Sequence, residues 1–185
     1  MNTLFSHVCV VTMDDRMSVW TDAFVGVTDG KISYLSKHAP EEKPDQIIDA
    51  TGMVLMPGLI NCHTHLPMQL LRGYADDLKL QEWLNDYIFP REDRLDGRCV
   101  RAATTLAVAE CLKFGVTSVS DMYYFCDDIC DVIAKSGMKA NISRGTSMFL
   151  GDDFDFEKFP ACQELVALKE KWHNYDGGRI KIEAS

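Results

Sequence analysis

The sequence predicts an α/β protein in which a small β unit precedes alternating strands and helices. Residues 1–52 contain short segments rich in Val, Phe, Ile and Thr, the residue types that favour strands. From residue 53 onward, short apolar runs alternate with longer segments of helical periodicity, which is typical of parallel βαβ units. We therefore expect residues 1–52 to form a β unit and residues 53–185 to form a separate α/β part.

The β unit begins with three predicted strands. They cover residues 4–12, 19–28 and 31–36. Asp29-Gly30 separates the last two strands, and this pair tolerates the positive φ angles of a type I′ turn. A β-hairpin is therefore expected between residues 24–28 and 31–35.

The triplet His63-Thr64-His65 follows an apolar run that is predicted to be a buried strand. Four apolar residues flank a Pro-Gly break in this run: Val54, Leu55, Leu59 and Ile60. Residues two apart on a strand point to the same side of the sheet, so His63 and His65 can face one point. Two converging imidazoles indicate a metal site, with a hydrogen-bonded core histidine as the plain alternative.

Two helices are predicted after this triplet. A short helix is expected over residues 80–89, ended by Pro90 because proline lacks a backbone N–H. A longer helix is expected to begin after Asp96 as its N-cap and to run to Phe114, with Gly115 as its stop.

Three further strands and two further helices alternate along the rest of the chain. The strands are expected over residues 116–120, 138–143 and 179–183, and the helices over residues 126–136 and 160–174. Asp121 follows the first of these strands, and Arg144 follows the second. Both side chains are therefore expected at the carboxyl end of a parallel sheet, where barrel enzymes hold their active sites.

Charge and composition restrict the classes of partner. The formal net charge is −9 and the basic residues are scattered, so neither nucleic acid nor an acidic membrane surface is an expected partner. The N-terminus lacks a basic leader and its apolar stretch stops at Asp14, which argues against a signal peptide or membrane span and favours the cytoplasm. The seven dispersed cysteines are expected to be reduced thiols.

A family resemblance is carried by residues 57–93, which read PGLINCHTHLPMQLLRGYADDLKLQEWLNDYIFPRED. This stretch resembles the amidohydrolase superfamily, most of all its 5-methylthioadenosine/S-adenosylhomocysteine deaminases and their triazine-hydrolase relatives. The resemblance implies the N-terminal half of a metal-dependent hydrolase (β/α)8 TIM barrel, preceded by part of a small accessory β-sandwich domain. The implied reaction is hydrolytic deamination of an adenine nucleoside (methylthioadenosine, S-adenosylhomocysteine or adenosine), with release of ammonia.

For the metal, the resemblance implies one divalent ion held by His63 and His65. Zn²⁺ is the first choice, and Fe²⁺ or Mn²⁺ are the alternatives. The family's further ligands, two histidines and an aspartate, and its proton-shuttling glutamate would lie beyond Ser185. No catalytic residue is therefore predicted within the chain, and a supporting role is favoured for Asp121 over direct metal binding.

For the substrate, the resemblance implies three binding residues. Trp83 would line the nucleoside pocket, Glu92 would accept hydrogen bonds from the ribose hydroxyls, and Arg144 would help to bind the 5′ substituent. Each has an ordinary structural alternative. Trp83 is also a packing residue at helical spacing, Glu92 could pair with Arg91 or Arg94, and Arg144 could form a salt bridge with a neighbouring acid.

The length of the chain bears on its activity. A complete barrel needs about 250 residues, whereas the chain has 185. The four predicted barrel strands cannot close, so the sequence predicts either a missing second half or a homo-oligomer in which two copies complete one barrel. Three functions stay open: the nucleoside deaminase, another amidohydrolase of the triazine, guanine or cytosine type, and an inactive truncated fragment. Both enzymes would act on a small molecule.

Overall fold

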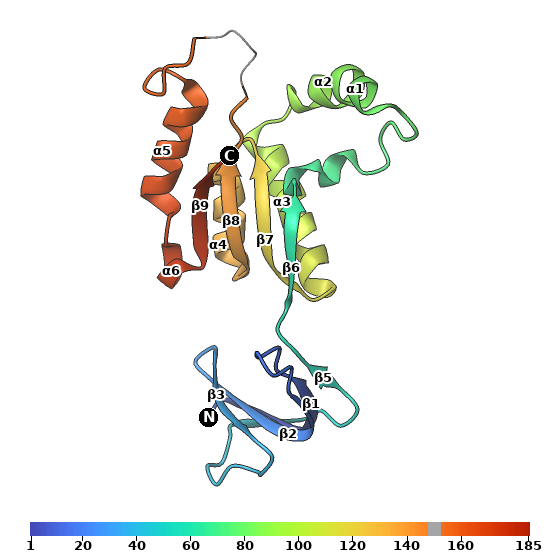
Figure 1. The fold of residues 1–185 in the computed structure, drawn as a ribbon, viewed down its shortest axis with the longest axis vertical. Helices are drawn as coiled ribbons and strands as arrows, with labels where there is room; N and C mark the ends of the chain where they lie inside the picture. The colour runs from blue at the N-terminus through green and yellow to red at the C-terminus, as the bar shows by residue number, and fades with distance from the viewer. Residues whose placement is uncertain (148–152) are drawn as a thin grey trace. The chain divides into compact units, whose positions relative to one another are not determined.

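The structure of the protein is a computed structural model that describes residues 1–147 and 153–185. Its elements form two compact units, Met1–Pro57 and Gly58–Ser185, called unit 1 and unit 2 below (Figure 1). Unit 1 is built from strands, and unit 2 is built from alternating strands and helices. The predicted α/β fold class is confirmed.

Unit 1 is one β-sheet. Its strands are β1 (Thr3–Val11), β2 (Val19–Thr28), β3 (Lys31–Ser36), β4 (Gln46–Asp49) and β5 (Val54–Leu55). They lie in the order β3-β2-β1-β4, and β5 also pairs with β1. The predicted hairpin is confirmed, because β2 and β3 are antiparallel and the turn residues Asp29 and Gly30 have φ angles of 50° and 73°.

The Pro57-Gly58 break divides the apolar run before the histidine triplet between two sheets. β5 pairs with β1, whereas β6 (Leu59–Thr64) belongs to the sheet of unit 2. Unit 1 therefore extends to Pro57 and does not end after residue 52. The prediction of one buried strand is wrong, because the run is split and β6 is an edge strand on which Ile60 is 67% exposed.

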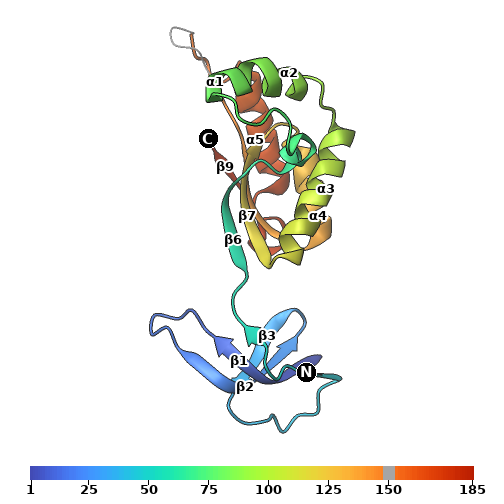
Figure 2. The same cartoon turned by 90° about the vertical axis from the view of Figure 1, so that its right-hand side faces the viewer.

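Unit 2 is a parallel sheet with helices on one face. The strands are β6, β7 (Val116–Tyr123), β8 (Lys139–Arg144) and β9 (Ile180–Ala184), in that order. The helices are α3 (Gly97–Lys113), α4 (Cys126–Ser136) and α5 (Pro160–Trp172). Figure 2 shows all three helices on one side of the strands. Parallel strands in sequence order, with a helix between each strand and the next, are the arrangement of successive units in a β/α barrel.

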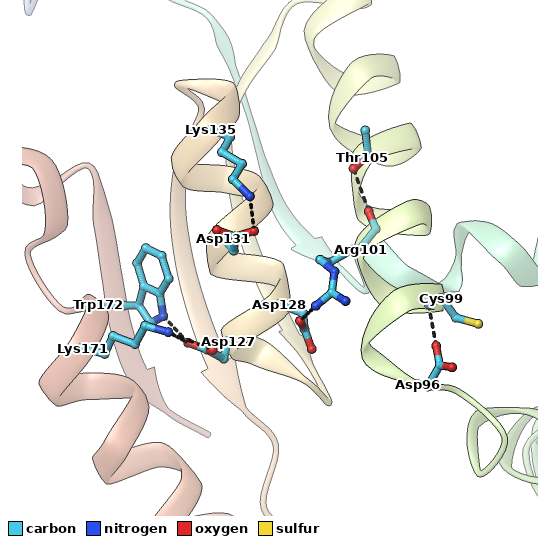
Figure 3. A network of polar contacts seen from close by, with 10 residues as sticks. All are labelled: Asp96, Cys99, Arg101, Thr105, Asp127, Asp128, Asp131, Lys135, Lys171 and Trp172. Atoms are coloured by element: carbon cyan, nitrogen blue, oxygen red, sulfur yellow. Dashed lines mark hydrogen bonds and ion pairs between the residues drawn. The ribbon is translucent and has the colours of Figure 1, made fainter.

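The ends of α3 and α4 are encoded locally. The side chain of Asp96 accepts a hydrogen bond of 2.7 Å from the backbone N–H of Cys99, which caps the first turn of α3 (Figure 3). Gly115 and Gly137 follow α3 and α4 with φ angles of 80° and 79°. Glycine adopts this left-handed conformation without steric cost, so both predicted helix stops are confirmed.

Pro90 does not end the helix that is predicted over residues 80–89. The helix runs through α1 (Leu80–Glu82), a π-helical turn η2 (Trp83–Ile88) and α2 (Phe89–Glu92). In the π-helical turn the N–H of Phe89 donates to the carbonyl of Leu84. The wider turn accommodates both the ring of Pro90 and its missing N–H, so the helix continues to Glu92.

The remaining helices are short. The 3₁₀ helix η1 (Leu66–Leu71) follows β6, and α6 (Tyr175–Gly178) precedes β9. The predicted helix over residues 160–174 ends at Trp172. None of the helices within residues 1–147 and 153–185 is long and apolar enough to cross a membrane.

The hydrophobic core of unit 2 lies between α4 and the sheet. Its fully buried side chains include Ile129, Cys130, Ile133, Val119, Ile142 and Ile180. Cys126 on the same helix is also buried, and burial raises the pKa of its thiol to about 12. This thiol is therefore protonated at neutral pH and packs as a small apolar side chain.

Two aspartates in the first turn of α4 connect this helix to both of its neighbours (Figure 3). Asp128 forms an ion pair with Arg101 of α3. Asp127 accepts hydrogen bonds from Nζ of Lys171 at 2.7 Å and from Nε1 of Trp172 at 2.6 Å, both on α5. Negative charge is also favourable beside the exposed N–H groups of a helix N-terminus. These contacts hold the three helices in one layer.

A graded truncation of Ile129 tests the packing of this core. Ile129→Val removes one methylene and should lower the free energy of unfolding by about 0.5–1.5 kcal/mol, whereas Ile129→Ala should lower it by about 2–5 kcal/mol. Urea denaturation followed by tryptophan fluorescence measures both values. Equal, small losses for the two variants would contradict a close-packed interface between α4 and the sheet.

Candidate metal and substrate site

His63 and His65 lie where β6 departs from regular pairing. The parallel register with β7 is irregular between Asn61 and Thr64, and the N–H of His63 donates to Oδ1 of Asn61 at 3.2 Å. The two imidazole rings are neighbours, with centroids 5.2 Å apart and planes at 74°. The structure therefore brings together the two side chains that the sequence predicts as metal ligands.

The ring of His65 is oriented by the neighbouring strand. Its Nδ1 lies 2.6 Å from the carbonyl oxygen of Met122 on β7. A carbonyl can only accept, so Nδ1 carries the proton and Nε2 is the nitrogen with a free lone pair. A backbone carbonyl that fixes the tautomer in this way is the usual second partner of a metal-binding histidine.

Asp121 supports the chain directly after His65. It is 1% exposed, and its Oδ1 accepts a hydrogen bond of 2.6 Å from the backbone N–H of Leu66. Its Oδ2 is buried and has no hydrogen-bond partner among the described residues. Burial raises the pKa of Asp121 to about 7, while the hydrogen bond from the Leu66 N–H and the electrostatic interaction with His65 oppose this shift.

The two histidines fit part of a metal site. A catalytic zinc site uses about three protein ligands and leaves one position open. Within the described ranges, no three side chains of His, Cys, Asp or Glu are grouped so that they could hold a metal. The adjacent rings and the fixed tautomer of His65 suit a divalent ion, and metal binding by His63 and His65 stays a prediction.

Glu92 lies at the end of α2 and is partly buried. Its Oε1 accepts a hydrogen bond of 2.5 Å from the hydroxyl of Tyr123. Neither Arg91 nor Arg94 pairs with it in the part of the chain that the structure describes, and Nε of Arg91 donates instead to the hydroxyl of Tyr74 at 3.1 Å. The ion-pair alternative that the sequence left open for Glu92 is therefore not observed.

Arg144 is held in place by two neighbours. Its Nε lies 2.5 Å from Oε2 of Glu164 on α5, and its guanidinium carbon lies 4.9 Å from the ring centroid of Tyr124. The salt-bridge alternative for Arg144 is thus present in the structure. Its predicted contact with the substrate stays a prediction.

Two of the three predicted substrate residues line one cavity, which has a volume of about 980 Å³. Glu92 and Arg144 both line it, together with apolar and aromatic side chains that include Tyr124, Phe125 and Leu168. Trp83, in the π-helical turn, is not among its described lining residues, and neither are the two histidines. His65 instead borders a smaller cavity of about 360 Å³ beside η1 and α3.

Tyr123 is the contact residue that sequence reasoning missed. The strand is predicted over residues 116–120, with Asp121 after it, whereas β7 continues to Tyr123. Residues two apart on a strand share a face. A predicted strand that extended to Tyr123 would therefore have placed its side chain on the same face as that of Asp121.

The arrangement of unit 2 defines the chain as a β/α-barrel type of protein. Residues 54–184 match the model of the Amidohydrolase family. The chain is 35% identical over 185 residues to a 5-methylthioadenosine/S-adenosylhomocysteine deaminase of Acetivibrio thermocellus, with 98% of this chain and 42% of the relative covered. It is 41% identical over 178 residues to a 5′-deoxyadenosine deaminase of Methanosarcina mazei, with 96% and 40% covered. The chain belongs to the amidohydrolase family and spans less than half the length of these relatives.

Solved structures agree with this fold. An adenosine deaminase from Xanthomonas campestris with bound zinc superposes with a TM-score of 0.83 at 30% identity, covering 99% of this chain and 42% of that one. An atrazine chlorohydrolase from Arthrobacter aurescens complexed with zinc has a TM-score of 0.86 at 20% identity, covering 98% and 46%. At the lower identity the likeness shows the fold alone. The predicted fold, part of a TIM barrel, is confirmed.

The support that Asp121 gives to the end of β6 can be tested through metal affinity. In the natural full-length protein, Asp121→Ala should weaken zinc binding by roughly 10–100-fold, because the main chain beside His65 loses its anchor. Asp121→Asn keeps an acceptor oxygen and should lose less. Competition with a chelator measures the affinities.

The matched control is Asp131→Ala, which removes a carboxylate from the surface of α4, where it pairs with Lys135. This variant should bind zinc as the wild type does. An unchanged zinc affinity in Asp121→Ala, or an equal loss in Asp131→Ala, would contradict the supporting role.

Proposed function

We propose that the protein is a metal-dependent hydrolytic deaminase of adenine nucleosides, in which His63 and His65 bind a divalent ion. Zn²⁺ is the expected ion, with Fe²⁺ and Mn²⁺ as alternatives. The observation that carries the proposal is the pair of adjacent imidazoles, with His65 oriented by the carbonyl of Met122. The names of the relatives support it, since they are deaminases of 5-methylthioadenosine, S-adenosylhomocysteine and 5′-deoxyadenosine.

The reaction replaces the exocyclic amine of the adenine ring with oxygen. Water adds to the ring carbon that bears the amine, the carbon–nitrogen bond breaks, and the amine leaves as ammonia. Bound zinc would lower the pKa of a water molecule to about 7, so that hydroxide is available at neutral pH. The described residues contribute to binding and orientation in this proposal, and no proton-transfer role is assigned to any of them.

Three side chains would hold the nucleoside. Glu92 would accept hydrogen bonds from the ribose hydroxyls, and Arg144 would contact the 5′ substituent. Their position on one cavity of about 980 Å³ supports a common ligand, since this volume lies within the usual range for small-molecule sites. Trp83 would line the pocket for the base from the π-helical turn, outside the described lining of this cavity.

We also infer that unit 2 is the first four β/α units of a barrel and that unit 1 is part of an accessory β domain. The sequential parallel order β6-β7-β8-β9 supports this inference. So does the exposure of apolar side chains on the edge strand β6, where Leu59 and Ile60 are 52% and 67% exposed. Such an edge normally pairs with a further strand or is covered.

The proposed reaction predicts ammonia release. The natural full-length protein, loaded with zinc, should release ammonia from at least one of adenosine, methylthioadenosine and S-adenosylhomocysteine. His63→Ala and His65→Ala should each lower kcat/KM by about a hundredfold or more, because each removes a metal ligand. His173→Ala is the control, since His173 lies at the end of α5 and bonds to Ile182. Ammonia from none of the three nucleosides would exclude the proposed function.

The role of Glu92 predicts a difference between nucleoside and free base. Glu92→Gln should raise the KM for the nucleoside roughly tenfold, because a charged acceptor for the ribose hydroxyls is lost, and should leave turnover of adenine nearly unchanged. Glu170→Gln, on the exposed side of α5, is the matched control. Equal losses on both substrates would contradict ribose recognition and favour an amidohydrolase that acts on free ring compounds.

A further inference from the structure

We propose that Tyr123 is a positioning residue that holds Glu92 in the orientation needed to bind the ribose hydroxyls, and that it thereby sets the preference for nucleosides over free bases. This inference rests on the proposed function and extends it to a residue outside the predicted site. It is carried by the hydrogen bond of 2.5 Å from the hydroxyl of Tyr123 to Oε1 of Glu92.

Contacts other than the hydrogen bond to Glu92 hold the ring of Tyr123 in place. The side chain is 4% exposed at the carboxyl end of β7. Its ring centroid lies 6.1 Å from that of His65 and 5.3 Å from that of Tyr124, so the ring has two aromatic neighbours. A buried ring that packs against other rings has few accessible rotamers, and its hydroxyl therefore has a defined position.

The hydrogen bond from Tyr123 occupies only one of the two carboxyl oxygens of Glu92. Burial, followed by the nearby Glu92 carboxylate, raises the pKa of Tyr123 above its usual value, so the phenol remains a proton donor at neutral pH. The phenol occupies Oε1, which leaves Oε2 as an acceptor for another donor. The hydrogen bond from Tyr123 fixes the orientation of the Glu92 carboxylate, and its second oxygen can then accept a hydrogen bond from a hydroxyl group of the ligand.

Nearby cations do not compete for Glu92. Arg144 lines the same cavity but pairs with Glu164, and Arg91 donates to Tyr74. Among the described residues, no Lys, Arg or His forms an ion pair with Glu92. The carboxylate of Glu92 is therefore available to neutral hydrogen-bond donors, and the two adjacent hydroxyl groups of a ribose are donors of this kind.

The decisive variant is Tyr123→Phe, which removes the hydroxyl and keeps the ring against His65. In the zinc-loaded, natural full-length protein, this variant should raise the KM for adenosine about tenfold while kcat changes less than about twofold. The KM for 2′,3′-dideoxyadenosine, which lacks both ribose hydroxyls, should stay the same. Zinc content should also stay the same, because the contacts of His65 are retained.

Tyr175→Phe is the matched control. Tyr175 is the first residue of α6, packs against Trp172, and does not line the cavity that holds Glu92. Removing its hydroxyl deletes the same atom elsewhere in unit 2 and should leave both KM values unchanged.

A double variant distinguishes positioning from general loosening of the structure. If Tyr123 acts through Glu92, then Tyr123→Phe combined with Glu92→Gln should raise the KM for adenosine no more than Glu92→Gln alone does. Additive effects, or an equal rise in the KM for the dideoxynucleoside, would overturn the inference. So would an unchanged KM for adenosine in Tyr123→Phe. A wild-type protein that releases no ammonia from any nucleoside would instead overturn the proposed function.

Discussion

The parallel register between β6 and β7 is the constraint on which the candidate site depends. Thr64 lies opposite Asp121 in this register, which places residues 121–123 beside the point where the chain leaves β6. Groups from these three residues then reach three different targets: the backbone N–H after His65, the His65 ring and the carboxylate of Glu92. A slip of one residue in the pairing of β7 would turn the side chains of Asp121 and Tyr123 to the opposite face of the sheet. One strand pairing therefore sets the geometry around both a predicted metal ligand and a predicted substrate residue.

The helix-covered face of the sheet contains the contacts that hold unit 2 together. Asp127 and Asp128 tie α4 to α5 and α3, and the fully buried Ile129 and Ile133 fill the space behind the strands. Close packing of this kind fixes the strands because rigid side chains leave them little room to shift. The predicted metal ligands lie at the carboxyl end of β6, whereas Asp127 and Asp128 also line the cavity that contains Glu92 and Arg144. The packing of the helices and the shape of this cavity are therefore linked.

Features decided by a few neighbouring residues could be predicted from the sequence. The turn at Asp29 and the cap at Asp96 depend on backbone conformations and short-range hydrogen bonds that few residue types provide. The failures have tertiary causes. Apolar composition does not reveal whether a strand has one partner or two, so β6 was expected to be buried. Pro90 is expected to end a helix, but a π-helical turn accommodates it, and such a turn leaves no clear sequence pattern. The contact between Tyr123 and Glu92 joins separate elements that only the folded chain brings together.

The burial of Cys126 and Cys130 has a consequence for how metal would reach the protein. Thiolates are strong zinc ligands, and an unfolded chain with seven cysteines offers many of them. In the folded core, burial raises the pKa of both thiols, so they are protonated and shielded from solvent. In the folded protein these two thiols are therefore withheld from zinc, whereas in an unfolded chain they are exposed and can bind it. The order of folding and metal loading would then decide whether the ion reaches the strand end or is misplaced.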